Sequence, residues 1–144
     1  MCPDNEGMRD HFRELFLEMH NYRRSNIALG KVRKDTGRNF PMGADMQKMV
    51  YDCDLEADAM IYAETCALQR SYPGTRKGQG ENVAVVQPSS AEDFTAAVEW
   101  AVRSWYRRIK SADSIGVKKV TFREKHKYTA VAYATQVTPQ LHLL

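Results

Sequence analysis

The sequence lacks several features that would assign it to a specialised class of protein. No apolar run reaches the roughly 18 residues that a membrane-spanning helix needs, and there is no internal repeat or low-complexity tract. The first residues show no basic start followed by an apolar centre, so no secretory leader is visible. Such a start suits a mature secreted protein and a cytosolic protein equally well. The remaining composition is that of a globular protein, and 144 residues favour a single domain.

Cysteine is scarce, and its pattern excludes some chemistry. The three cysteines are Cys2, Cys53 and Cys66, an odd number that allows one internal disulfide and leaves one thiol. No CxxC spacing indicates a zinc site or a dithiol redox centre, and no N-x-S/T glycosylation site is present. Cys66 lies among alanines on a predicted helix, so we expect it to be buried or disulfide-bonded.

Charge is distributed unevenly along the chain. The net charge is +3, but residues 101–127 carry nine lysines and arginines against Asp113 and Glu124, which leaves −4 elsewhere. Such a stretch forms either a solvated face or a surface for phosphate, sulfated sugar, anionic lipid or acidic protein. Nucleic acid is not expected as a partner, because no helix-turn-helix, zinc-finger or RNP-type aromatic motif accompanies the charge.

Hydrophobic periodicity predicts mainly helices. Apolar residues at helical spacing predict helices over residues 6–29, 46–50, 54–68 and from about 91 to 110, the last preceded by a capping box at Ser89–Glu92. Glycine and proline predict loops over residues 31–45 and 71–80. Residues 117–122 suit a strand or an irregular segment, and residues 128–134 a buried helix. From pattern alone, this content would suggest a helical bundle.

Five segments, in order, make the chain similar to a known family. They are Phe16-Leu-Glu-Met-His-Asn-Tyr-Arg-Arg-Ser25, Met49-Val-Tyr-Asp-Cys-Asp-Leu-Glu56 with the small residues up to Cys66, Gly80-Glu-Asn-Val83, Trp105-Tyr106 and Lys127-Tyr-Thr-Ala-Val-Ala-Tyr133. Each segment alone is weakly specific, but their order and spacing over residues 10–136 are distinctive. The chain resembles the CAP superfamily, and within it the activation-associated secreted proteins of nematodes.

The resemblance implies an α+β fold in place of a bundle. CAP domains are α-β-α sandwiches, with helices on both faces of a small antiparallel sheet. Residues 1–144 would form one such domain, without the C-terminal segment that the family usually carries. At least one central strand would then be missing, which would leave a sheet edge unpaired.

The resemblance also locates a cleft in which many CAP domains hold a divalent ion with two histidines and two glutamates. In this sequence the four positions are occupied by Arg70, Glu81, Arg108 and Lys127. Arginine offers no accessible lone pair and lysine is protonated near neutral pH, so we expect no metal and no cofactor there. His126 is one residue early, which on a helix turns a side chain by about 100°.

Two residues near this cleft have structural interpretations. For Glu81 we expect a role in capping nearby backbone and bracing the glycine-rich loop, or a pairing with one or more of the three cations. The functional alternative is a cleft that accepts an anion such as sulfate, phosphate or a carboxylate. His20 is expected to brace neighbouring elements through hydrogen bonds, since no Ser-His-Asp or Cys-His order is present.

The family resemblance yields functional hypotheses and a disulfide assignment. The leading hypothesis is a secreted, non-enzymatic binding protein that acts on a host or extracellular protein, or on an anionic ligand. The alternative is a lipid or sterol carrier, and a hydrolase is the third, less favoured, possibility. If the chain is oxidised, we expect Cys2 to pair with Cys66, although Cys2–Cys53 is also possible.

Overall fold

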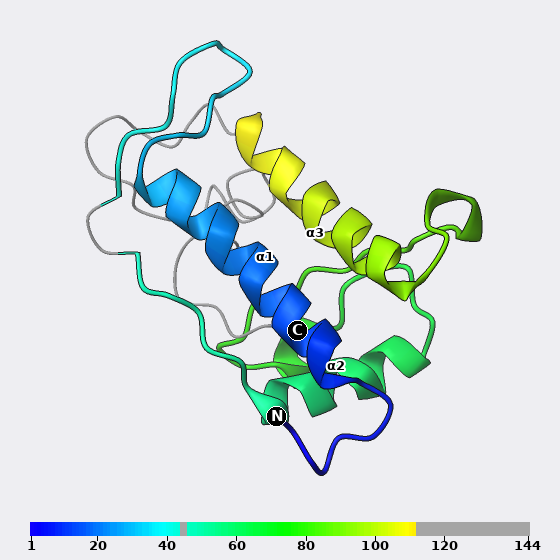
Figure 1. The fold of residues 1–144 in the computed structure, drawn as a ribbon. Helices are drawn as coiled ribbons and strands as arrows, with labels where there is room; N and C mark the ends of the chain where they lie inside the picture. Colours follow the sequence, from blue (N-terminus) through cyan, green and yellow to red (C-terminus); the bar gives the residue numbers. More distant parts are fainter. Residues whose placement is uncertain (44–45, 112–144) are drawn as a thin grey trace.

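The computed structural model describes residues 1–43 and 46–111, and in these residues the chain forms three α-helices (Figure 1). The helices are α1 (Asp10–Ala28), α2 (Cys53–Glu64) and α3 (Phe94–Lys110). Two short 3₁₀ helices, η1 (Pro73–Thr75) and η2 (Pro88–Ser90), lie in the long connection between α2 and α3. The described part is therefore built from helices and extended connections.

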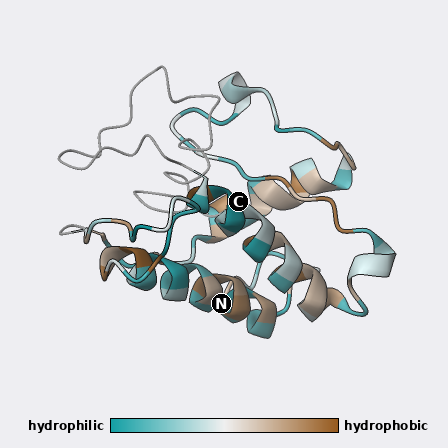
Figure 2. Cartoon of the chain, turned by 90° about the horizontal axis from the view of Figure 1, so that it is seen from above, coloured by the Kyte–Doolittle hydropathy of each residue, from teal (hydrophilic) through white to brown (hydrophobic). Residues whose placement is uncertain are grey.

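Helices α1 and α3 pack side by side and run in the same direction (Figure 1). Near their amino ends, the rings of Phe12 and Phe94 meet edge to face with centroids 4.5 Å apart. Near their carboxyl ends, Ile27 and Ile109 share a core cluster with Val32. Ile109 is 1% exposed, so the carboxyl end of α3 packs closely against α1. Figure 2 shows that both helices carry hydrophilic as well as hydrophobic residues, as one-sided burial requires.

The ends of the helices differ from the predicted ends for local reasons. Helix α1 starts at Asp10 and not at residue 6, because Gly7 adopts a φ of +94° that a right-handed helix does not allow. The side chain of Asp52, and not of Asp54, caps α2 by accepting from the backbone N–H groups of residues 54 and 55. The side chain of Asp93 caps α3 by accepting from the backbone N–H of Ala96. The predicted capping box at Ser89–Glu92 lies before the first residue of this helix.

The short helix predicted over residues 46–50 does not form, because α1 engages this backbone in an extended conformation. The Asn21 amide donates to the carbonyl of Met49 (3.1 Å) and accepts from its N–H (2.8 Å). The Arg24 guanidinium donates to the carbonyl of Gln47 (3.1 Å). These bonds satisfy backbone groups that helical turns would otherwise pair. The His-Asn-Tyr-Arg-Arg motif of the sequence therefore includes a clamp from α1 onto the next segment.

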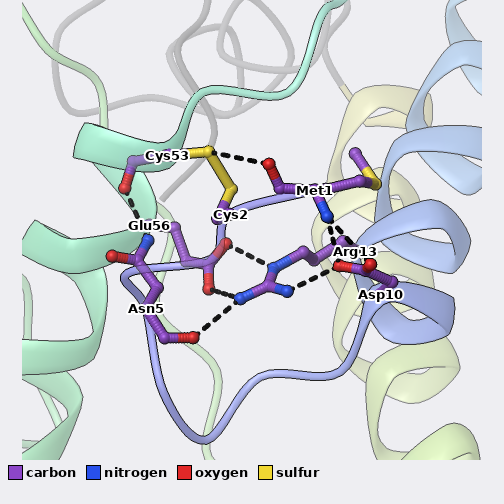
Figure 3. A network of polar contacts seen from close by, with 7 residues as sticks. All are labelled: Met1, Cys2, Asn5, Asp10, Arg13, Cys53 and Glu56. Atoms are coloured by element: carbon purple, nitrogen blue, oxygen red, sulfur yellow. Dashed lines mark hydrogen bonds and ion pairs between the residues drawn. A yellow bond between two sulfur atoms is a disulfide. The ribbon is translucent and has the colours of Figure 1, made fainter.

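The disulfide joins Cys2 to Cys53, so the expected Cys2–Cys66 pairing is wrong. The N-terminal arm lies against the first turn of α2, where the Asn5 side chain donates to the carbonyl of Cys53 (2.7 Å) (Figure 3). Cys66 follows the far end of α2, roughly 20 Å from Cys53 at 1.5 Å per residue, whereas bridged cysteines need Cα atoms within about 7 Å. Cys66 is a free, exposed thiol, which also corrects the expectation of burial.

A buried ion pair fastens the same arm and α1 to α2. Arg13 donates from Nε and Nη2 to the two carboxylate oxygens of Glu56 at 2.8 and 2.7 Å, and from Nη1 to Asp10 at 2.6 Å (Figure 3). The side chains of Arg13 and Glu56 are 5% and 3% exposed. The bidentate bonds from Arg13 hold the pKa of the Glu56 carboxyl below its usual range. The N-terminal arm is thus held by one disulfide and by charge-assisted hydrogen bonds.

The predicted antiparallel sheet stays a prediction. Among residues 1–43 and 46–111, β-type pairing is limited to an isolated antiparallel bridge between Arg33 and Asn39. The predicted segments at 117–122 and 128–134 lie outside the described residues. No helix in the described part of the chain is long and apolar enough to cross a membrane.

Candidate functional site

The side chain of Glu81 is buried at the end of the loop that joins η1 to the segment before α3. It is 5% exposed as a residue. Its Oε2 accepts from the backbone N–H of Ser71 at 2.6 Å, and its Oε1 accepts from the Ser71 hydroxyl at 2.8 Å. Both carboxylate oxygens are therefore used to fix the start of the loop to its end, as the bracing interpretation of Glu81 expects.

The cation beside Glu81 is Arg76, which the sequence did not single out. Its Nε lies 3.6 Å from Oε2 of Glu81 and donates to the hydroxyl of Ser71 at 2.9 Å. Its Nη1 donates to the carbonyl of Gln79 at 2.9 Å. Because Arg76 is only 14% exposed at its side chain, the pair is largely shielded from water. Ser71, Arg76 and Glu81 together close residues 71–81 into a cross-braced loop, which we call the Glu81 loop.

The Glu81 loop is attached to the paired helices by a tryptophan. The indole N–H of Trp105 on α3 donates to the carbonyl of Val83 at 3.2 Å. The ring of His20 on α1 lies beside this indole, with centroids 6.1 Å apart. Since Val83 is two residues from Glu81, these contacts fix the position of the carboxylate relative to both helices.

His20 packs between α1 and Trp105 of α3, but its hydrogen bond lies within α1, whereas the sequence predicts a bond to a neighbouring element. Its Nδ1 lies 2.7 Å from the carbonyl oxygen of Phe16, one turn earlier on α1, so Nδ1 carries the proton and donates. The residue is 4% exposed. Burial lowers the pKa of the imidazole, and the charges of Arg23 and Arg24 act in the same direction. His20 is therefore a neutral packing residue between α1 and Trp105 at neutral pH.

Two buried amide oxygens flank Glu81. Within the described residues, Gln79 Oε1 and Asn82 Oδ1 have no hydrogen-bond donor. Rotation of either amide would present its NH₂ group in place of the oxygen. The site thus combines a charge-balanced carboxylate with two adjustable polar groups.

The other predicted cleft residues are not all within the described part of the chain. Arg70 is half-buried and directly precedes Ser71, while Arg108 is exposed in the last turn of α3. Lys127 and His126 lie outside the described residues. The structure therefore places Glu81 in detail but does not test the four-residue cleft as a unit.

The described residues around Glu81 do not form a group that would hold a divalent metal ion. In residues 1–43 and 46–111, no three His, Cys, Asp or Glu side chains gather where they could hold a metal. The carboxylate of Glu81 is already engaged by Ser71 and Arg76. A metal would have to displace this internal cation, which repels it. The sequence could have suggested that Ser71 and Arg76 contact Glu81, because both lie in the short Gly/Pro-rich stretch before it.

Comparison with known proteins places these features in a wider context. The CAP family profile, described as "Cysteine-rich secretory protein family", matches residues 17–140. The chain is 38% identical over 109 residues to Ancylostoma secreted protein of Ancylostoma caninum, a match that covers 76% of this chain and 26% of that protein. It is 34% identical over 109 residues to Hookworm platelet inhibitor 1 of the same organism, covering 76% of this chain and 45% of the inhibitor. The chain thus spans less than half the length of either relative.

Solved structures of similar fold include NaASP2 and BmVAL-1. NaASP2 superposes with a TM-score of 0.78 at 36% identity, covering 95% of this chain and 70% of NaASP2. BmVAL-1 superposes with a TM-score of 0.81 at 23% identity, covering 99% of this chain and 70% of BmVAL-1.

Proposed function

The chain belongs to the CAP, or cysteine-rich secretory protein, family, and we propose that it is a secreted, non-enzymatic protein that binds a host or extracellular partner. Its relatives are named as secreted proteins, venom allergens and a platelet inhibitor. The Cys2–Cys53 disulfide suits an oxidising, extracellular environment. A parasite-type effector is the specific form of this proposal.

The proposal that the chain is not an enzyme rests on the hydrogen bonds and the ion pair of Glu81. General acid–base or metal-assisted chemistry needs a carboxylate that can reach a substrate proton or an ion. Here both oxygens of Glu81 are bonded to Ser71, with Arg76 alongside. NaASP2 has been crystallised with Zn²⁺. We propose that this chain does not bind the ion, because Arg70, Arg108 and Lys127 occupy the other ligand positions that the resemblance implies.

An anion is the ligand that this cleft would suit. The four positions that the resemblance assigns to the cleft carry three cations, Arg70, Arg108 and Lys127, against the single acid Glu81, so together they are net positive. Cations in a partly desolvated concave site attract sulfate, phosphate or carboxylate groups. We therefore propose that the cleft recognises an acidic segment of a protein partner.

The binding proposal is tested with labelled, disulfide-intact protein on blood cells and immobilised plasma proteins. We expect saturable binding that unlabelled protein displaces and that a chelator leaves unchanged, since no metal takes part. The reduced and alkylated protein serves as the misfolded control. Absence of saturable binding to every cell type and protein would contradict the proposal. A bound lipid in solvent extracts, identified by mass spectrometry, would favour the carrier alternative.

A further inference from the structure

The carboxyl ends of α1 and α3 meet at a hairpin that is rich in cations. Residues 32–40 fold back on themselves through bonds from the N–H of Phe40 to the carbonyl of Val32 (2.9 Å) and from the N–H of Lys34 to the carbonyl of Arg38 (2.8 Å). The N–H of Asp35 at the tip donates to the carbonyl of Lys110 at 3.1 Å, which ties the hairpin to the end of α3. Figure 1 shows this end of the molecule far from α2.

The hairpin packs against the hydrophobic core at the carboxyl ends of α1 and α3. Val32 and Phe40 are 6% and 5% exposed and pack with Ile27 and Ile109. The ammonium group of Lys34 lies 4.7 Å from the centroid of the Phe40 ring. These contacts anchor the hairpin backbone to the ends of α1 and α3, and a surface anchored before binding lowers the entropic cost of association.

Positive charge dominates this end. Residues 29–42 contain four cations and one acid, Asp35, and the last turn of α3 adds further cations without an acid. Besides Arg108, which the resemblance assigns to the cleft, the exposed members are Lys31, Arg33, Arg38, Arg107 and Lys110. We call these five residues the basic end. It is distinct from the Glu81 loop.

Two apolar side chains protrude beside the basic end. Leu29 is 52% exposed and Met42 is 78% exposed. Met42 packs against Gly30, whose φ is +65°, since a Cβ added there would lie 3.0 Å from Cγ of Met42. Met42 therefore lies over the residue next to Leu29. An apolar pair next to exposed cations is not explained by packing within the described chain.

We propose that the basic end docks on an anionic phospholipid surface, with Leu29 and Met42 entering the headgroup layer. Lysine and arginine near such a surface are attracted to its phosphate and carboxylate groups. Apolar side chains gain by leaving water for the boundary of the acyl chains, whereas a sulfated sugar chain offers them no such environment. The combination of both features favours the lipid surface over a polysaccharide.

Vesicle sedimentation tests this surface with matched variants. The intact protein should bind phosphatidylcholine vesicles that contain phosphatidylserine, with partitioning that falls as salt rises. The double replacement Lys31→Gln with Arg38→Gln should weaken partitioning onto the vesicles by about 25-fold, or about fivefold per cation. Met42→Gln should weaken it by roughly tenfold through loss of apolar insertion.

The controls change equal charge and apolarity elsewhere. Arg9→Gln with Lys77→Gln removes two exposed cations distant from the hairpin, and Ile61→Gln removes a side chain that is 68% exposed on α2. These variants should bind vesicles like the unaltered protein. Equal losses in the controls, or no vesicle binding at low salt, would overturn the proposal. Retention on heparin that depends on Lys31 and Arg38, without vesicle binding, would assign the basic end to a polysaccharide and also overturn it.

Discussion

Replacing Cys2 and Cys53 together by serine is expected to lower the free energy of unfolding by about 4 kcal/mol, the value that the chain-entropy model gives for so long a loop. The disulfide closes a loop with a sequence separation of 51 residues. Its loss frees the denatured chain and releases the N-terminal arm from α2. The arm would then be held by the ion pair of the Met1 ammonium group with Asp10 and by the bonds of Arg13 and Asn5. Urea denaturation under non-reducing conditions measures the difference.

The matched control for this experiment is Cys66→Ser. Because Cys66 is free and exposed, its replacement should leave the denaturation midpoint unchanged. Peptide mapping of the oxidised protein should find Cys2 joined to Cys53. If Cys66→Ser destabilises the oxidised chain as strongly as the double replacement, the pairing described here is wrong.

The second large effect is expected at Glu81. The replacement Glu81→Ala removes the acceptor for the N–H and hydroxyl of Ser71, and it leaves Arg76 without the carboxylate partner that Glu81 provides. Hydrogen bonds to charged groups contribute about 1.5–3 kcal/mol each, and unsatisfied buried donors add a cost of their own. We expect the free energy of unfolding to fall by about 3 kcal/mol, measured by urea denaturation.

Glu81→Gln separates the loss of charge from the loss of the acceptor. Glutamine keeps one oxygen for Ser71, so we expect it to retain a large part of the stability. Gln87→Ala, at an exposed position in the same connection, serves as a surface control and should have no effect. A Glu81→Ala variant as stable as the unaltered protein would show that the carboxylate does not brace the loop.

The helical spacing of apolar residues predicted all three helices, but of the buried side chains only those of α3 are all apolar, whereas α1 buries Arg13, His20 and Arg24. Helices α1 and α3 form over most of the expected residues, but α1 starts at Asp10 instead of residue 6 and α3 at Phe94 instead of about residue 91. The ends that moved depend on single residues, such as the φ of Gly7 and the cap at Asp52. Periodicity carries no information on such local choices.

The contacts that were missed join segments far apart in the sequence. The clamp from Asn21 to Met49 overrides the local helical pattern of residues 46–50 through tertiary hydrogen bonds. The disulfide depends on which end of α2 the N-terminal arm reaches, and three cysteines alone do not fix that. The family resemblance identified Glu81, whereas its partner Arg76 lies in a loop whose conformation has no periodic signal.

Titration calorimetry with zinc tests the central claim, that Glu81 is a structural brace and not a metal ligand. The account predicts no stoichiometric heat of zinc binding to the disulfide-intact protein at neutral pH, with the same trace for Glu81→Gln. One zinc ion bound per chain, with binding lost in Glu81→Gln, would contradict it. In that case the ion would have to displace the bonds from Ser71 and the nearby Arg76, and Glu81 would be a metal ligand.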